Sequence, residues 1–169
     1  AAAWADCSTC DADLGPVRTA INEFTVAIVD ELAAAMGAEV TVISQTRSKE
    51  EDGRHFGATD WIATTEDPDA VKKRRGEFDV ILSTISAQYS LNDYLQLLKP
   101  RGIMSVVGLP PEELGIHMSS LVGGGKVLTG NNIGGIAETQ EMLDFCAEHG
   151  IGAVIEKIGV NDVDDAYER

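Results

Sequence analysis

The sequence lacks a long apolar run, a surplus of positive charge and a dense set of cysteines. Its 169 residues suit a single domain, and no apolar run approaches the roughly 20 residues that a membrane-spanning helix needs. The first residues, from Ala1 to Asp6, lack the charged and apolar regions of a signal peptide. The formal net charge of −15 argues against binding to nucleic acids or anionic membrane surfaces, because both attract a basic face. We therefore expect neither a nucleic acid nor a membrane as a partner.

The three cysteines, Cys7, Cys10 and Cys146, do not suggest a disulfide framework and indicate a reducing, cytoplasmic compartment. Cys7 and Cys10 form a C-x-x-C, but a structural zinc site needs four ligands and no second pair follows. The histidines are His55, His117 and His149. They show no ligand spacing, and no carboxylate or nucleophile pairs with them. We expect no catalytic residue and no metal ligand in this chain.

From about Gly37 onward, short β-branched runs alternate with helical stretches. The predicted strands are Glu39–Ser44, Trp61–Ala63, Phe78–Ser83, Gly102–Gly108, Lys126–Gly130 and a last one at Ala153–Glu156. Strands that alternate with helices predict an α/β fold, a doubly wound parallel sheet of the Rossmann-like kind. Ligands of such sheets bind beyond the carboxyl ends of the strands. We therefore expect the functional residues directly after Ser44, Ser83, Gly108 and Gly130.

Capping signals mark the helices between these strands. Ser48 and Glu51 form a capping-box pattern. Asp67 precedes Pro68 as a candidate cap, and Ser90 or Asn92 can start a helix over Leu91–Leu98. A further helix follows Ile136: it carries the apolar stripe Met142, Leu143, Phe145 and Cys146 and closes at Gly150. On this stripe, Cys146 is predicted to be a small core residue.

The segment after the second predicted strand reads Ser44-Gln45-Thr46-Arg47-Ser48-Lys49. In a dinucleotide-binding fold, an acidic residue here accepts from the ribose 2′-hydroxyl and selects NAD. This segment has no carboxylate before Glu50 and offers hydroxyls, an amide and two cations instead, which are donors for a phosphate. The spacing alone is equally consistent with a polar turn that carries solvated charges.

Several stretches resemble, in order along the chain, the medium-chain zinc-dependent alcohol dehydrogenases, and most closely their cinnamyl-alcohol-dehydrogenase-like branch, which prefers NADP(H). These stretches are Ala35–Ser44, Phe78–Ala87, Asp93–Pro100, Val107–Pro110, Ile133–Gly135 and Glu138–Cys146. The resemblance implies that the chain is the NADP(H)-binding domain of an enzyme that interconverts primary alcohols and aldehydes. It also implies that the catalytic zinc is bound by a separate domain, so no zinc is expected in this chain.

The resemblance also implies a role for each cofactor-binding position. The residues for the adenosine 2′-phosphate are Ser44, Gln45, Thr46 and Lys49, with Arg47 beside them. Thr84 and Ile85 match the strand end that lines the cofactor, and Val107, Gly108 and Leu109 match the loop beside the nicotinamide. Asn131, Asn132 and Ile133 match a segment that usually reads Ser-x-Ile and contacts the nicotinamide amide; Asn131 replaces the serine there. Family members commonly form homodimers through the sheet edge, and Lys126–Gly130 is the candidate edge.

The first thirty residues depart from the family pattern. The first strand of the family ends in a G-x-G-x-x-G turn that lets the backbone approach the pyrophosphate. The corresponding stretch, Val17–Val26, contains no glycine and places Glu23 where the diphosphate belongs. Ile21, Phe24, Ile28 and Leu32 have the spacing of an amphipathic helix. We therefore divide the chain into an atypical segment 1–30, which covers the first strand, and an NADP(H)-binding Rossmann domain 31–169.

Two other interpretations stay open. The missing glycines and Glu23 are consistent with a non-catalytic, truncated or engineered Rossmann-like module without working cofactor binding, because a fold does not imply a function. The exposed strand edge is consistent with an interaction module.

Overall fold

A six-stranded sheet forms the centre of the computed structural model, which describes residues 18–22, 27–67, 69–153, 155 and 157–168. All neighbouring strands run parallel, in the order β3-β2-β1-β4-β5-β6. The strands are β1 (Arg18–Asn22), β2 (Glu39–Ser44), β3 (Ala58–Ala63), β4 (Phe78–Ser83), β5 (Leu98–Val106) and β6 (Val127–Gly130). The strand order reverses between β1 and β4, which confirms the predicted doubly wound, Rossmann-like α/β fold.

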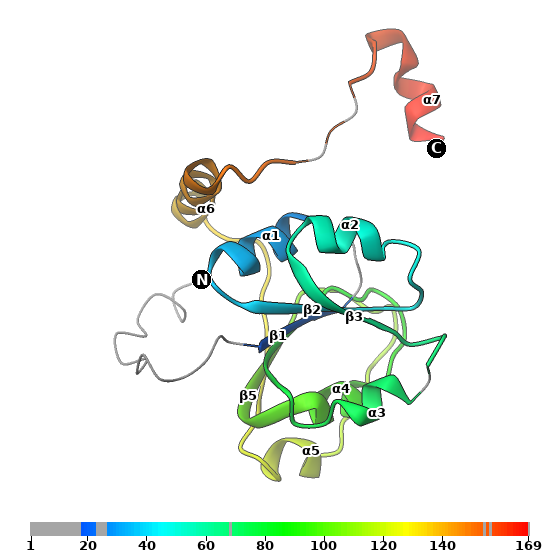
Figure 1. The fold of residues 1–169 in the computed structure, drawn as a ribbon, viewed down its shortest axis with the longest axis vertical. Helices are drawn as coiled ribbons and strands as arrows, with labels where there is room; N and C mark the ends of the chain where they lie inside the picture. Colours follow the sequence, from blue (N-terminus) through cyan, green and yellow to red (C-terminus); the bar gives the residue numbers. More distant parts are fainter. Residues whose placement is uncertain (1–17, 23–26, 68, 154, 156, 169) are drawn as a thin grey trace.

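Helices cover both faces of the sheet (Figure 1). Helices α1 (Ala27–Ala35) and α2 (Glu50–His55) lie on one face. Helices α3 (Ala70–Lys73), α4 (Leu91–Leu97) and α5 (Ser119–Val122) lie on the other. Because crossover helices bury a parallel sheet on both faces, its central strands can be apolar on both sides. In β2 the four residues from Val40 to Ile43 are accordingly all buried.

Two apolar clusters make up the described core, one on each face of the sheet. The cluster under α3 and α4 contains Ile43, Ile62, Phe78, Ile81, Leu91, Leu95, Leu97, Leu98 and Met104. The cluster under α1 and α2 contains Val40, Val42, Ala58, Trp61 and Ala63. At the ends of β2 and β3, Val42 and Trp61 enter one cluster and Ile43 and Ile62 the other, as side chains of a strand alternate between the faces of a sheet.

Strand β1 lies in the middle of the sheet, between β2 and β4. The spacing of Ile21 with Ile28 and Leu32 predicted a helix there, but Ile21 pairs with Val42 and Leu82 as part of β1. The prediction was wrong for Ile21 because pairing with two neighbouring strands overrides a short helical periodicity. Phe24, Glu23 and the Cys7–Cys10 pair lie outside the described residues.

The bounds of β3, β5 and β6 differ from the predicted ones; β6 begins at Val127 rather than at Lys126. Strand β3 begins at Ala58, three residues before the predicted strand. Strand β5 begins at Leu98, directly after α4, and its pairing with β4 is irregular where Arg101 adopts a φ of 64°. No strand forms at Ala153 or Ile155, so the predicted last strand is wrong at the positions that the structure describes.

The predicted helix starts were correct at one of three places. Ser90 caps α4 by accepting a hydrogen bond from the amide of Asp93. The capping box at Ser48 is wrong: α2 begins at Glu50, and the Ser48 hydroxyl bonds instead with that of Thr46. Helix α3 begins at Ala70 rather than at the predicted position after Asp67.

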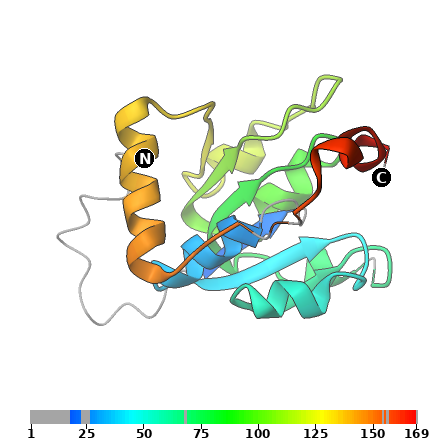
Figure 2. The ribbon, with the colours of Figure 1, turned by 90° about the horizontal axis from the view of Figure 1, so that it is seen from above.

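Helix α6 (Ile136–His149) follows β6, the last strand of the sheet. It ends as predicted at Gly150, which has a left-handed φ of 69°. The predicted core residue Cys146 is buried. A 3₁₀ turn η1 (Val160–Asp162) and helix α7 (Val163–Tyr167) follow, and Figures 1 and 2 show that α6 lies on the α1 side while α7 stands away from the sheet. None of the helices in the described ranges is long and apolar enough to cross a membrane.

Candidate functional site

One row of paired residues crosses all six strands near their carboxyl ends. This row consists of Ile62, Ile43, Asn22, Ser83, Val106 and Gly130. Four of the predicted site segments start one residue later, at Ser44, Thr84, Val107 and Asn131. The structure therefore brings the four segments together along one edge of the sheet, where ligands of open parallel sheets bind.

The backbone after β5 lies directly against the backbone at the end of β4. The amides of Val107 and Gly108 both donate to the carbonyl of Ser83, at 2.9 and 3.2 Å. A Cβ atom on Gly108 would lie 2.2 Å from the carbonyl oxygen of Ile85. This position requires glycine because two backbones meet there. Leu109, the next residue, is 85% exposed and is therefore available to a ligand.

The end of β6 continues the same edge. The amide of Asn131 donates to the carbonyl of Val106 at 3.3 Å, which extends the β5–β6 ladder by one residue. The side-chain oxygen of Asn131 accepts from the amide of Asn132 at 2.9 Å. All three predicted residues, Asn131 to Ile133, are exposed.

The segment after β2 is shaped by the neighbouring strand β3. The carbonyl of Ser44 accepts from the amide of Thr64 at 2.9 Å, and that of Gln45 accepts from the amide of Thr65 at 3.0 Å. The indole N–H of Trp61 donates to the carbonyl of Thr46 at 3.1 Å. These bonds fix the backbone of the predicted phosphate-binding segment while Gln45 to Lys49 stay exposed.

Two carboxylates hold Arg47. The backbone amide of Arg47 donates to Oε1 of Glu66 at 3.1 Å, and its Nε lies 3.4 Å from Oε2 of the same residue. Its terminal nitrogen donates to Glu50 at 2.5 Å, and Glu50 is also bonded by Arg54. The hydrogen bond with Glu50, followed by its charge, raises the pKa of Arg47. Arg47 is therefore charged at every physiological pH.

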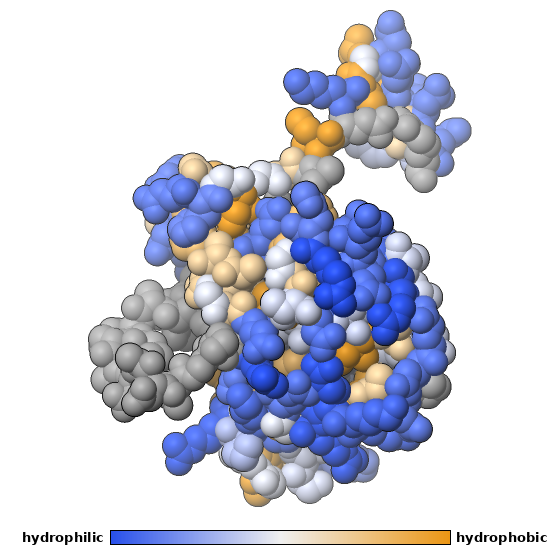
Figure 3. Space-filling view, viewed as in Figure 1, coloured by the Kyte–Doolittle hydropathy of each residue, from blue (hydrophilic) through white to orange (hydrophobic). Residues whose placement is uncertain are grey.

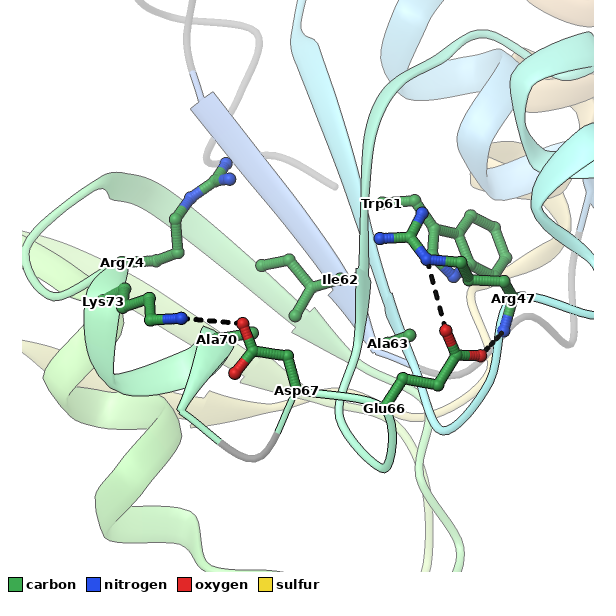
Figure 4. Close-up of a pocket in the computed structure, with 9 residues that line it drawn as sticks. All are labelled: Arg47, Trp61, Ile62, Ala63, Glu66, Asp67, Ala70, Lys73 and Arg74. Carbon is green, nitrogen blue, oxygen red and sulfur yellow. Dashed lines mark hydrogen bonds and ion pairs between the residues drawn. The ribbon is translucent and has the colours of Figure 1, made fainter.

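A pocket of about 390 Å³ opens beside this loop, at the edge strand β3 (Figure 4). Its lining residues are Arg47, Trp61, Ile62, Ala63, Glu66, Asp67, Ala70, Lys73 and Arg74. Lys73 pairs with Asp67 at 2.8 Å, and Arg74 pairs with Asp60 at 2.6 Å. The pocket thus combines three cations with acids that partly neutralise them, next to the predicted 2′-phosphate site.

Sequence reasoning missed the contribution of β3. The segment Ser44 to Lys49 has no carboxylate of its own, yet Glu66 reaches it from the end of the adjacent strand. The signal was present, because Thr64, Thr65 and Glu66 directly follow a strand that must lie beside β2 in this fold. It was also missed that the Ser83 hydroxyl at the end of β4 bonds with the hydroxyl of Tyr89 at 3.1 Å.

The described residues do not fit a zinc ion. No group of three or more His, Cys, Asp and Glu side chains that could hold a metal is found among them. A catalytic zinc site uses three protein ligands with such side chains. No chemical step that involves zinc can therefore be assigned to residues of the described ranges.

Comparison with known proteins finds a matching family model and similar sequences. The model of the zinc-binding dehydrogenase family matches residues 27–148. The chain is 50% identical over 139 residues to the NADP-dependent alcohol dehydrogenase C of Mycobacterium bovis, which covers 82% of this chain and 40% of that protein. It is 46% identical over 140 residues to cinnamyl alcohol dehydrogenase 7 of rice, Oryza sativa, which covers 82% and 37%. The chain thus spans about 40% of the length of these curated relatives.

Solved structures show the same similarity in three dimensions. A cinnamyl alcohol dehydrogenase from Sorghum bicolor superposes with a TM-score of 0.81 at 34% identity, over 92% of this chain and 45% of that one. A cinnamyl alcohol dehydrogenase from Helicobacter pylori, solved in complex with NADP(H), gives a TM-score of 0.77 at 33% identity, over 91% and 44%.

Proposed function

Because this chain belongs to the zinc-binding dehydrogenase family, we propose that it binds NADP(H) for an alcohol dehydrogenase that interconverts primary alcohols and aldehydes. One observation carries the cofactor assignment: the segment after β2, at the ligand-binding edge of the sheet, presents donors and cations and no carboxylate of its own. A 2′-phosphate satisfies such a segment, whereas an unmodified ribose is normally bound by an acid at this position.

Each predicted residue has a place in this proposal. Ser44, Gln45, Thr46, Arg47 and Lys49 hold the adenosine 2′-phosphate. Thr84 and Ile85 line the cofactor at the end of β4. Val107, Gly108 and Leu109 lie beside the nicotinamide, and Asn131, Asn132 and Ile133 contact its amide group. When bound, the nicotinamide supplies or accepts a hydride, and the residues of this chain bind and orient it.

We further propose that the alcohol and the zinc are bound by protein outside the described residues. The segment after α6 supports further packing, because its large apolar side chains are exposed: Ile155 by 70%, Val160 by 86% and Tyr167 by 89%. Figure 3 shows hydrophobic residues gathered on this segment, whereas hydrophilic residues dominate the body of the molecule on the face in view.

We also propose a homodimer through the sheet edge and a cytoplasmic location. Strand β6 is an outer strand of the sheet, and its Val127 is 46% exposed, which favours pairing with a second copy. The small number of cysteines is typical of a reducing compartment. A monomeric mass in solution at all protein concentrations would contradict the homodimer.

Calorimetric titration of the chain with NADPH and NADH tests the cofactor proposal. We expect NADPH to bind at least about tenfold more tightly, because a hydrogen bond to a charged group contributes about 1.5 to 3 kcal/mol. Equal affinity for the two cofactors, or no binding of either, would overturn it.

The second candidate is a module with this fold but without cofactor binding. It is favoured by the absence of glycine from Val17 to Val26, where the family has its pyrophosphate turn. A ligand that binds the native state must raise the melting temperature. A rise that depends on NADPH concentration would therefore exclude this candidate.

A further inference from the structure

The carboxylate of Glu66 makes the contacts with Arg47 that an anionic ligand would make. It accepts from the backbone amide at 3.1 Å with one oxygen and approaches the guanidinium Nε within 3.4 Å with the other. Figure 4 shows both interactions at the mouth of the pocket. A backbone N–H beside a guanidinium is a typical donor pair for phosphate oxygens. A 2′-phosphate bound at this loop would need the same donors.

We propose that Glu66 is a specificity-determining residue: its carboxylate occupies the phosphate position on Arg47 and must be displaced before a 2′-phosphorylated cofactor can use those donors. This inference rests on the proposed NADP(H) function. The inference goes beyond that function in two ways. Glu66 lies between β3 and α3 rather than in the loop after β2, and its carboxylate weakens NADP(H) binding instead of supporting it.

The geometry makes Glu66 displaceable while Arg47 stays in place. The side chains of Arg47 and Glu66 are 53% and 49% exposed, so water can solvate the carboxylate as it leaves. Surface ion pairs of this kind contribute at most about 1 kcal/mol. Arg47 keeps its second partner, because Glu50 is only 20% exposed and is anchored by Arg54 at 2.7 Å. The guanidinium therefore remains at the site after Glu66 has moved.

The experiment compares two adenosine fragments that differ only by the 2′-phosphate: adenosine 2′,5′-bisphosphate and adenosine 5′-monophosphate. Their affinities are measured by calorimetry for the wild-type chain and for Glu66→Gln, which keeps the size of the side chain and removes its charge. The matched control is Asp67→Asn, which removes a neighbouring charge that pairs with Lys73 and not with Arg47. These fragments lack the pyrophosphate, so the glycine-free stretch does not affect the comparison.

We expect Glu66→Gln to bind the bisphosphate about two- to fivefold more tightly than the wild type, with the monophosphate unchanged. Asp67→Asn should produce less than half of this effect. The inference is overturned if Glu66→Gln leaves the bisphosphate affinity unchanged, or if Asp67→Asn increases it as much. If the wild-type chain binds the bisphosphate more tightly than the monophosphate, and Glu66→Gln has the same affinities as the wild type, only the role of Glu66 is refuted. Failure of both proteins to distinguish the fragments refutes the cofactor proposal as well.

Discussion

Asp30 is a buried carboxyl group in the first turn of α1. The residue is 2% exposed, and no hydrogen bond or ion pair links its side chain to another residue in the described part of the chain. Burial, and then the neighbouring charge of Glu31, raise the pKa of Asp30 from 3.8 to about 7. We predict that Asp30→Asn stabilises the protein at alkaline pH and much less at acidic pH.

The size of this effect follows from proton linkage. The folded state holds a proton that the unfolded state loses near pH 3.8, so stability decreases as the pH rises from about 4 to about 7 and is level above that. The raised pKa of Asp30 lowers the free energy of unfolding by roughly 4 kcal/mol between low and high pH. Roughly 2.5 kcal/mol of this loss occurs between about pH 5 and about pH 8.5. The carboxylates with lowered pKa, such as Asp60 and Asp67, act in the opposite direction but are common to both proteins and cancel.

Urea denaturation of the wild type and of Asp30→Asn at these two pH values measures the effect. The gain in unfolding free energy from the substitution should be larger by about 2 to 3 kcal/mol at the higher pH. The cost of burying the amide of the variant is the same at both pH values, so it drops out when the two gains are subtracted. The control Glu31→Gln removes the adjacent charge, leaves the buried carboxyl and should keep most of the pH dependence. An identical gain at both pH values would refute the reasoning, as would an NMR titration of Asp30 with a midpoint near 4.

Three further predictions follow from the site and its supports. Replacing both Arg47 and Lys49 with glutamine should weaken NADPH binding by about tenfold or more and leave NADH nearly unchanged in calorimetric titrations; equal weakening would show that these side chains do not read the 2′-phosphate. Gly108→Ala should destabilise the fold by about 1 to 3 kcal/mol in urea denaturation, because its Cβ would overlap backbone at 2.2 Å, whereas Gly115→Ala, with nothing within 4 Å, should be neutral. Ser90→Ala removes the cap of α4 and should cost about 1 kcal/mol by the same measurement; an unchanged unfolding free energy would show that this cap does not stabilise α4.

Strands β2 and β4 could be predicted from the sequence because each of them is locally consistent. Strands β2 and β4 have their predicted bounds, since β-branched and apolar residues there are buried on both faces of a parallel sheet. Strand β1 was harder to assign, because its five residues include Arg18 and Asn22 and have no apolar run. Its place is set by pairing on both sides and by Arg18, whose amide donates to Asp79 at 2.9 Å. Such contacts join residues far apart in the sequence and are invisible to a local pattern.

The candidate site could be predicted in its layout but not in its electrostatics. Four loop segments were expected at one edge of the sheet, and the register places them there. The segment after β2 was interpreted as free of carboxylates, because only its own residues and the next ones in the chain were considered. The structure adds Glu66, which is nineteen residues from Arg47 in sequence and bonded to its amide. Charge at a loop therefore has to be counted over the neighbouring strand as well.

A glycine at this edge of the sheet can be required by the fold or by the cofactor, and this chain has the glycine that the fold requires. Gly108 is required by the protein itself, because a side chain there would collide with the end of β4. The glycines of a pyrophosphate turn are required by the cofactor, whose phosphates must approach the backbone. A parallel ladder needs backbone N–H and C=O groups, which almost any residue supplies. Strand β1 accordingly pairs on both sides although the stretch Val17–Val26 has no glycine. The fold can thus persist while the pyrophosphate contribution is lost, and we expect recognition to depend mainly on the adenosine end.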